Sequence, residues 1–198
     1  MLYQIHRYPA ELIDVVRLAG GARVVIRPVL PQDRDLTGAF FRSLSSSARY
    51  DRFMGPMREL SAELLQRFTD IDYADHLALV AEVFAEGREV IVAEARFARR
   101  RDPAAAEFAV SVAEAWQGRG LARLMLGKLA CRAAAAGVQR LEGETLATNR
   151  AMLALARKAG FTITASLDVG GVMLLQKIVR APRPGSDCST AEAASLAA

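Results

Sequence analysis

The chain has 198 residues, of which 52% are hydrophobic and 24% charged, and a formal net charge of +4 at pH 7. This length suits one domain with a sizeable core, and so modest a basic excess, without basic runs among aromatic residues, does not indicate nucleic-acid binding. Residues 1–10 do not read as a signal peptide and no apolar run is long enough to span a bilayer, so we expect a cytoplasmic protein that contacts neither nucleic acid nor membrane.

The first predicted elements are a β-hairpin and two helices. Strands are expected over 11–18 and 22–28, joined by Gly20-Gly21, a pair that tolerates the positive φ angles of a tight turn. Apolar residues at helical spacing predict helices over 31–44 and 61–69, with a serine-rich interruption between them. The second hairpin strand is expected to enter the main sheet.

Three strands follow and are expected to form an antiparallel meander. They span 77–84, 90–98 and 107–113, and Glu86-Gly87-Arg88 supplies the first turn. Arg99-Arg100-Arg101 occupies the second turn. It suits either an exposed solubilising turn or a contact with ligand phosphates or an acidic protein surface.

The rest of the chain continues as helix, strand, helix and a second hairpin. Asn149 is the predicted N-cap of the second helix, and Gly160 is its predicted end. The helices span 121–136 and 149–160, and the strands span 139–147, 161–167 and 172–178. We therefore expect an N-terminal extension (1–21), one domain (22–180) and a flexible tail (181–198).

Three carboxylates, those of Asp70, Asp72 and Asp75, lie just before His76. They could bind a metal ion or a cationic substrate, or form a solvated loop, and they lack the regular alternation of most carboxylate metal sites. His76 could likewise be a site residue or a buried core histidine. The residues leave these alternatives open.

Cys131 falls in a predicted helix and Cys188 in the predicted tail. We expect both to be free thiols, because two cysteines make no disulfide framework. With only two histidines and no close pair of cysteines, the sequence predicts no zinc site, and we expect no metal.

The most informative stretch is Gln117-Gly118-Arg119-Gly120, between the strand 107–113 and the helix that begins at Leu121. Its glycines let the backbone approach a ligand closely, and the unpaired amides at the helix start point at that ligand. The arrangement predicts an anion site, most naturally for phosphate. It is neither a P-loop nor a dinucleotide fingerprint, because the residues that those motifs require next are absent.

The stretch resembles the acyl-CoA pyrophosphate loop of the GNAT superfamily of acetyltransferases. The resemblance rests on Gln117-x-x-Gly120-x-Ala122 after an apolar strand, on Asn149, and on Lys158-Ala159-Gly160-Phe161. It implies an α/β (α+β) GNAT fold. In that fold a mixed, mostly antiparallel sheet of six to seven strands, with an N-terminal hairpin, is flanked by about four helices.

The resemblance also implies how acetyl-CoA is bound. In this family two central strands splay apart, and the pantetheine arm pairs with one of them as an extra strand would. The pyrophosphate is expected on backbone amides of the loop, and the amide of Val112 is expected to face the thioester oxygen. The implied CoA-binding residues are Val110, Ser111, Val112, Gln117, Gly118, Arg119, Gly120, Leu121, Ala122 and Asn149.

A narrower resemblance, over residues 22–177, is to the catalytic domain of Pat-type bacterial protein lysine acetyltransferases. It implies acetyl-CoA as the donor and a protein lysine as the acceptor. The matching segments are Ile26-Arg27-Pro28-Val29-Leu30-Pro31-Gln32-Asp33, Arg49-Tyr50-x-Arg52-Phe53, Ile71-Asp72-Tyr73-x-Asp75-His76, Glu94-Ala95-Arg96-Phe97 and Ala106-Glu107.

Glu107 is the predicted general base. It begins the central strand about ten residues before the loop, and at about 3.3 Å per residue its carboxylate reaches the substrate side of the thioester, where we expect partial desolvation. The Pat-type resemblance implies the same role for Glu107. Glu144, on the next strand, is the alternative base. Glu82 and Glu94 are weaker candidates, and His76 is expected to line the site.

One position departs from the family pattern. Many GNAT enzymes carry a Tyr that reprotonates the leaving thiolate where this chain has Ala156. This difference favours a non-catalytic acyl-CoA sensor as an alternative function. A second alternative is an acetyltransferase for small amines, because acceptors vary within the superfamily.

Overall fold

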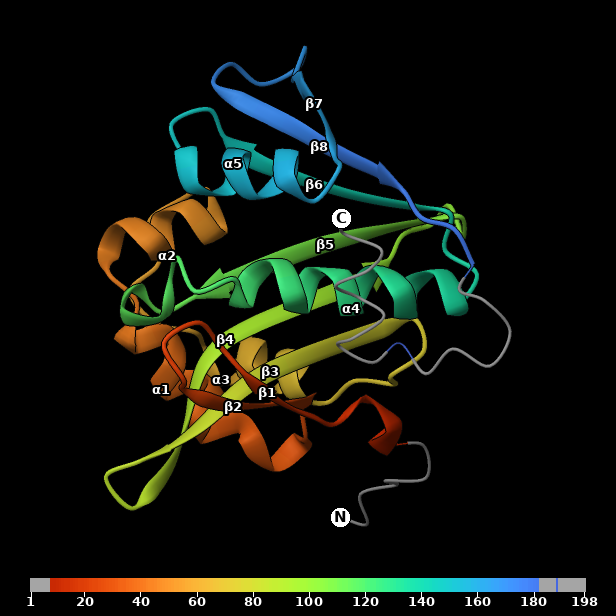
Figure 1. Ribbon diagram of the computed structural model, residues 1–198. Helices are drawn as coiled ribbons and strands as arrows, with labels where there is room; N and C mark the ends of the chain where they lie inside the picture. Colours follow the sequence, from red (N-terminus) through yellow and green to blue (C-terminus); the bar gives the residue numbers. More distant parts are fainter. Residues whose placement is uncertain (1–7, 182–187, 189–198) are drawn as a thin grey trace.

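The computed structural model describes residues 8–181 and Cys188, which form one eight-stranded sheet with helices on both faces (Figure 1). The strand order is β1-β2-β3-β4-β5-β6-β8-β7, and the β5–β6 pair is parallel while the other neighbours are antiparallel. The strands are β1 (Asp14–Arg17), β2 (Arg23–Pro28), β3 (His76–Ala85), β4 (Arg88–Arg99), β5 (Ala105–Val112), β6 (Arg140–Leu146), β7 (Thr162–Ala165) and β8 (Val172–Ile178). The helices are α1 (Arg34–Ser43), α2 (Ser46–Phe53), α3 (Ala62–Thr69), α4 (Leu121–Ala135) and α5 (Arg150–Lys158).

The predicted hairpins, meander and helices are confirmed, and the eight strands and five helices within the described residues are slightly more than expected. The additional helix, α2, begins where the sequence indicated an interruption. Ser45 is its N-cap, because the Ser45 hydroxyl accepts a hydrogen bond from the amide of Ala48 at 3.1 Å. The serine-rich stretch therefore separates α1 from α2 and also supplies the N-cap of α2.

Two hydrophobic cores lie on opposite faces of the sheet. On one face, Phe41 of α1 packs in a cluster with Val80 of β3. On the other face, Leu79 of β3 packs in a larger cluster with Leu129 of α4. Alternate residues of one strand thus serve the two cores, which is why β3 is apolar along nearly its whole length.

The parallel strands β5 and β6 stay together for only three residue pairs. These run from Ala105 with Arg140 to Glu107 with Glu142, although β5 continues to Val112 and β6 to Leu146. Beyond them the strands diverge, and we call the space between the diverging parts the wedge. It is the splay that the GNAT resemblance implied.

The closed end of the wedge is packed tightly. A Cβ atom at Gly143 would lie 2.7 Å from Cε1 of Phe108, so the Phe108 ring occupies the place of a side chain there. The same ring lies 4.8 Å from that of Phe161, between centroids. Glycine is therefore required where β6 begins to leave β5.

The prediction of two free thiols is wrong. Cys131 of α4 and Cys188 form a disulfide, and both residues are buried. Cys188 lies beyond the last predicted strand, and the fold brings it back to α4. The expected flexibility of residues 182–187 and 189–198 lies outside the described residues. Structural disulfides are typical of oxidising compartments, so the bond does not favour the predicted cytoplasmic location.

The aspartates before β3 form a loop rather than a metal cluster. Asp72 Oδ1 accepts backbone hydrogen bonds from Ala74, Asp75 and His76 at 2.8–2.9 Å. Burial raises the pKa of Asp72, but these donors outweigh it and the pKa is lowered. Within residues 8–181 and Cys188, no group of three or more His, Cys, Asp or Glu could hold a metal ion. None of the helices described there has the length and apolar character needed to cross a bilayer.

Candidate acyl-CoA and acceptor site

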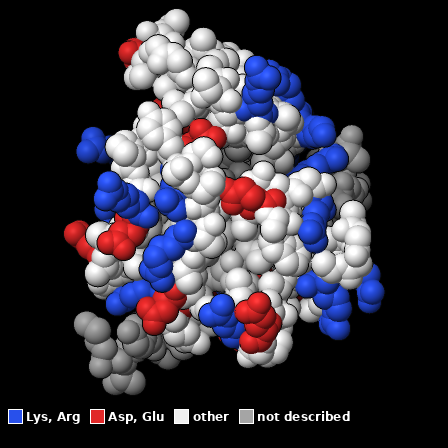
Figure 2. Space-filling view, turned by 90° about the vertical axis from the view of Figure 1, so that its left-hand side faces the viewer, with Lys and Arg blue, Asp and Glu red and all other residues white. Residues whose placement is uncertain are grey.

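A cavity of about 720 Å³ opens beside the wedge. It is lined by α2, β5, the loop before α4, the first residues of α4, β6 and α5. Figure 2 views the molecule from the side where α2 lies and shows a hollowed surface with acidic and basic side chains around it. A volume of this size is typical of sites for ligands as large as cosubstrates.

The predicted phosphate loop forms one end of this cavity. Gly118 and Gly120 have φ angles of +72° and +83°, which only glycine adopts without strain, and Gly120 is the N-cap of α4. Arg123 and Lys158 also line the cavity and add positive charge. Amides at a helix start and two basic side chains suit a pyrophosphate. Arg119 does not line the cavity, and its guanidinium lies 4.9 Å from the centroid of Trp116.

Beyond Glu107, one backbone edge of β5 faces the wedge and pairs with no strand in the part of the chain that the structure describes. Ala113 donates its amide to Val92 of β4, and backbone groups of a strand alternate between its two sides. Val110 and Val112 therefore direct their amides and carbonyls into the wedge, where β6 is out of reach. Gln117 Nε2 donates to the Val112 carbonyl at 3.0 Å, which leaves the Val112 amide directed at the cavity.

Glu107 is the last residue of β5 to pair with β6, so it stands at the closed end of the wedge and lines the cavity. Its side chain is 62% exposed, and its ion pair with Arg100 is long, at 3.4 Å. The expected partial desolvation of Glu107 is therefore wrong for the protein without ligands. The carboxylate is open to the cavity and to solvent.

Two weaker base candidates are engaged elsewhere. Glu94 is 2% exposed and forms a salt bridge with Arg96. Glu82 accepts from Arg27 Nε at 2.8 Å, and neither Glu82 nor Glu94 lines the cavity. Both carboxylates are therefore paired with guanidinium groups away from the cavity.

Glu144 and Asn149 both line the cavity. Glu144 is exposed and lies two residues beyond Glu142, so it remains the alternative base. Asn149 caps α5 as predicted, since its Oδ1 accepts from the amide of Met152 at 2.9 Å. The other predicted CoA contacts that line the cavity are Val110, Ser111, Val112, Gln117, Gly118, Gly120, Leu121 and Ala122.

His76 is not among the residues that line the cavity. Its Nε2 lies 3.3 Å from the Arg96 guanidinium. Burial, followed by the charge of Arg96, lowers the pKa of His76 to about 4, so the ring is neutral at pH 7. Its role as a site-lining residue stays a prediction.

Sequence reasoning missed several polar residues of the cavity wall, among them Arg52 and Thr145. Arg52 Nε and Thr145 Oγ1 are buried and have no hydrogen-bond partner in the part of the chain that the structure describes. Arg52 belongs to the segment Arg49-Tyr50-x-Arg52-Phe53 of the Pat-type resemblance, but the sequence predicted no role for it. Thr145 carried no signal, because a threonine in a strand is ordinary.

The fold and the site agree with a family match. Residues 23–162 match the family described as "Acetyltransferase (GNAT) domain". The chain belongs to the GNAT acetyltransferase family. It is an acetyl-CoA-dependent N-acetyltransferase.

Two curated relatives and one solved structure are particularly similar to this chain. Acetyltransferase PA5475 of Pseudomonas aeruginosa is 35% identical over 147 residues, which cover 74% of this chain and 79% of that protein. Acetyltransferase Pat of Mycolicibacterium smegmatis is 35% identical over 161 residues, 80% of this chain and 46% of that protein. The crystal structure of the GNAT domain of S. lividans PAT aligns with a TM-score of 0.80 and 30% identity, over 87% of this chain and all of that domain.

The residues present fit the acetyl-CoA of a GNAT enzyme. Left-handed glycines at the start of α4 and two basic side chains suit the diphosphate. The unpaired edge of β5 suits the amides of the pantetheine arm. The buried Thr145 hydroxyl, which lacks a partner among the described residues, suits a polar group inside the wedge.

Proposed function

We propose that the protein acetylates the side-chain amine of protein lysines by direct attack on the thioester, with Glu107 as general base. The observation that carries this proposal is the position of Glu107, exposed in the cavity at the point where β5 and β6 part. A carboxylate there can take a proton from an ammonium group directly or through one water.

The chain contributes position, hydrogen-bond donors and a base. The thioester supplies the activated acetyl group. The amides at the start of α4 hold the diphosphate, and the edge of β5 at Val110 orients the arm. An amide on the unpaired edge of β5, from Val110 to Val112, meets the oxygen that gains negative charge, and Glu107 accepts the proton of the attacking amine.

A protein acceptor is supported by the open surface next to the base. On β8, Leu174 pairs with Glu144 and Ile178 pairs with Arg140, so these side chains share one face of the sheet. Leu174 is 37% exposed and Ile178 is 65% exposed. An open apolar surface beside an acidic site can receive a lysine carried by a protein. Similarity to the relative named Pat supports the same acceptor.

The test compares Glu107→Gln with Glu144→Gln. Purified protein and acetyl-CoA are added to a cell extract, and lysine acetylation is measured by mass spectrometry. We expect Glu107→Gln to lower turnover by about 10²-fold to 10⁴-fold, which is the rate enhancement that a general base typically contributes. Glu144→Gln should have a far smaller effect. The reverse order would make Glu144 the base.

Two alternative functions predict other results. A small-amine acetyltransferase would acetylate amines in a panel but no protein lysine. A non-catalytic sensor would bind acetyl-CoA without any acetylated product, and the buried Ala156 at the position of the family's Tyr favours it. For the location, the cytoplasm predicted from the sequence stays a proposal, which the Cys131–Cys188 disulfide does not favour. Free Cys131 thiol in intact cells would support the cytoplasm, and a disulfide there would contradict it.

A further inference from the structure

Thr145 is a buried hydroxyl whose role the fold does not explain. The residue is 2% exposed, lines the cavity, and its Oγ1 has no hydrogen-bond partner among residues 8–181 and Cys188. Buried hydroxyls in folded proteins are nearly always hydrogen-bonded, because an unsatisfied one costs stability. A hydroxyl retained at this cost indicates a ligand.

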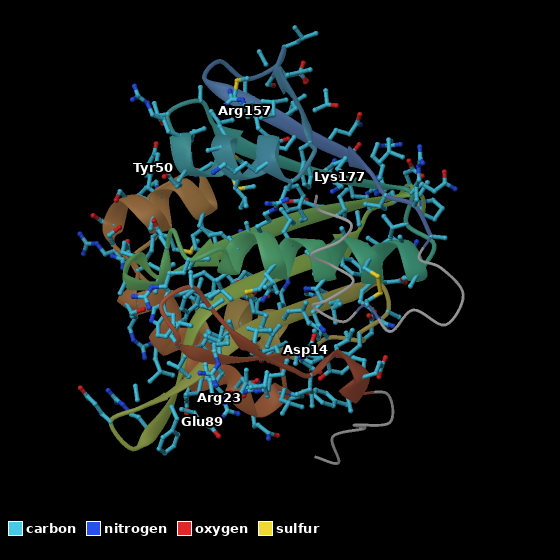
Figure 3. The ribbon with its side chains drawn as sticks, viewed as in Figure 1. Asp14, Arg23, Tyr50, Glu89, Arg157 and Lys177 are labelled. Atoms are coloured by element: carbon cyan, nitrogen blue, oxygen red, sulfur yellow. A yellow bond between two sulfur atoms is a disulfide. The ribbon has the colours of Figure 1, made fainter. Side chains whose placement is uncertain are left out.

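The direction of Thr145 follows from the register of β6. Leu141 pairs with Lys177 of β8, and the Lys177 side chain is labelled in Figure 3. Lys177 Nζ donates to the Ala159 carbonyl at the end of α5, at 2.5 Å. Paired residues of neighbouring strands share a face of the sheet, so Leu141 lies on the same side as Lys177, which is the α5 side. Because side chains alternate along a strand, Thr145 points to that side too, as would any side chain at Gly143. On that side the cavity wall includes the apolar side chains of Met152 and Leu155.

The position of Thr145 along the wedge selects the part of acetyl-CoA that it meets. The phosphate loop lies at one end of the cavity, and Gly143 under the Phe108 ring closes the wedge at the other end. Thr145 is two residues from Gly143, or about 6–7 Å along the strand. An arm anchored by its diphosphate at Gly120 therefore brings its thioester toward Thr145.

The chemistry of the step requires a donor at the sulfur. The amine nitrogen forms a bond to the carbonyl carbon, the carbon–sulfur bond breaks, and the sulfur keeps the electron pair as a thiolate. The proton of the amine leaves through Glu107. Ala156 has no polar side-chain atom to offer where the family's Tyr stands.

We propose that the Thr145 hydroxyl donates a hydrogen bond to the thioester sulfur and holds it as the thiolate forms. Thr145 keeps its own proton, and the thiolate takes one from water after release. Hydrogen bonds to charged acceptors are about twice as strong as neutral ones, so the contact is strongest when the charge is present. This inference rests on acetyl-CoA lying in the wedge as proposed above.

The experiment uses the full chain with Thr145→Val, which keeps the shape and removes the hydroxyl, and Thr145→Ser, which restores a hydroxyl. The ionisation of the CoA thiol in the binary complex is followed by its thiolate absorbance. We expect Thr145→Val to raise the pKa of the bound thiol by about one unit and lower kcat about tenfold, and Thr145→Ser to restore much of both. Without ligand, Thr145→Val should unfold at the same or a higher temperature.

Calorimetry with CoA and desulfo-CoA gives the second readout. Above the pKa of the bound thiol, Thr145→Val should weaken CoA binding about tenfold and leave desulfo-CoA binding unchanged. Equal weakening of both ligands, an unchanged thiol pKa, or a large fall in the unfolding temperature would each overturn the proposal. Because the binary complexes need no acceptor, these results are independent of the acceptor and of Glu107. Failure of the unaltered protein to bind either ligand would instead contradict the proposed acetyl-CoA site.

Discussion

Glu94 and Glu107 lie on neighbouring strands, yet their surroundings differ completely. Glu94 is 2% exposed and held by Arg96, which also lies 3.7 Å from the centroid of the Phe68 ring. Glu107 is 62% exposed and reaches Arg100 only at 3.4 Å. The Glu94 carboxylate lies in the part of the sheet that α1 and α3 cover, which we call the packed half. The Glu107 carboxylate lies where β5 and β6 diverge.

This difference shows how the same residue type serves structure in one region and chemistry in another. In the packed half, covered by α1 and α3, a buried charge is tolerated only with its partner. At the wedge, the divergence of β5 and β6 leaves the edge of β5 beyond Glu107 without a strand partner, and the Thr145 hydroxyl without a hydrogen-bond partner, among the described residues. A ligand can use those groups at no cost to the fold.

The largest expected effect is on the packed carboxylate. Arg96→Met leaves Glu94 buried and unpaired, so we expect the free energy of unfolding in urea to fall by about 3–5 kcal/mol. The double variant Arg96→Met with Glu94→Gln should recover most of this loss. Glu107→Gln should change stability by less than about 0.5 kcal/mol, because that side chain is exposed. A comparable loss in Glu107→Gln would remove the distinction between the two carboxylates.

A smaller effect on stability is expected from the disulfide, which joins Cys131 of α4 to Cys188 beyond β8. The residues between Cys131 and Cys188, 57 apart in sequence, include β6, α5, β7 and β8. Closing so long a loop restricts the unfolded chain, so replacing both cysteines with Ala should cost about 2–4 kcal/mol. A reducing agent should destabilise the unaltered protein by a similar amount and leave the double variant unaffected. An unaltered protein that is insensitive to reductant would contradict the bond.

Acid should lower the free energy of unfolding through the protonation of His76. Its pKa is about 4 in the folded protein, below the 6.5 of an unperturbed histidine, so protonation favours the unfolded chain. This contribution is complete above about pH 6.5 and is lost as the pH falls toward 4, and we expect a loss of about 1–2 kcal/mol between pH 7.5 and pH 5. His76→Gln should flatten that part of the stability curve. An equal fall in the variant would assign the effect to other groups.

Most of the fold was predictable because its elements have local signals. Gly20-Gly21 at the first hairpin and the two left-handed glycines before α4 act within a few residues of the turns they permit. Helix α2 was not recognised because none of its residues is buried, so it has no apolar stripe. The limits of the predicted domain, 22–180, stay a prediction.

The site was predictable only where it is continuous in sequence. The phosphate loop and the unpaired edge of β5 follow one another in the chain, so the resemblance located both. The disulfide and the lone Thr145 hydroxyl depend on contacts between distant segments, which periodicity does not report. The exposure of Glu107 likewise depends on where β5 and β6 part, about 35 residues apart in sequence.

The smallest expected effect tests whether Glu107 is free. Arg100 is 44% exposed and also lies 3.5 Å from Glu142, so its charge is well solvated. Ion pairs of this kind contribute about 0–1 kcal/mol, and we expect Arg100→Gln to change stability by less than that and kcat/KM by less than about threefold. Any change should vanish in about 1 M salt, where charges are screened beyond about 3 Å. If Arg100→Gln instead lowered kcat/KM a hundredfold at any salt concentration, Arg100 would position Glu107, and the base would be held by its partner as Glu94 is.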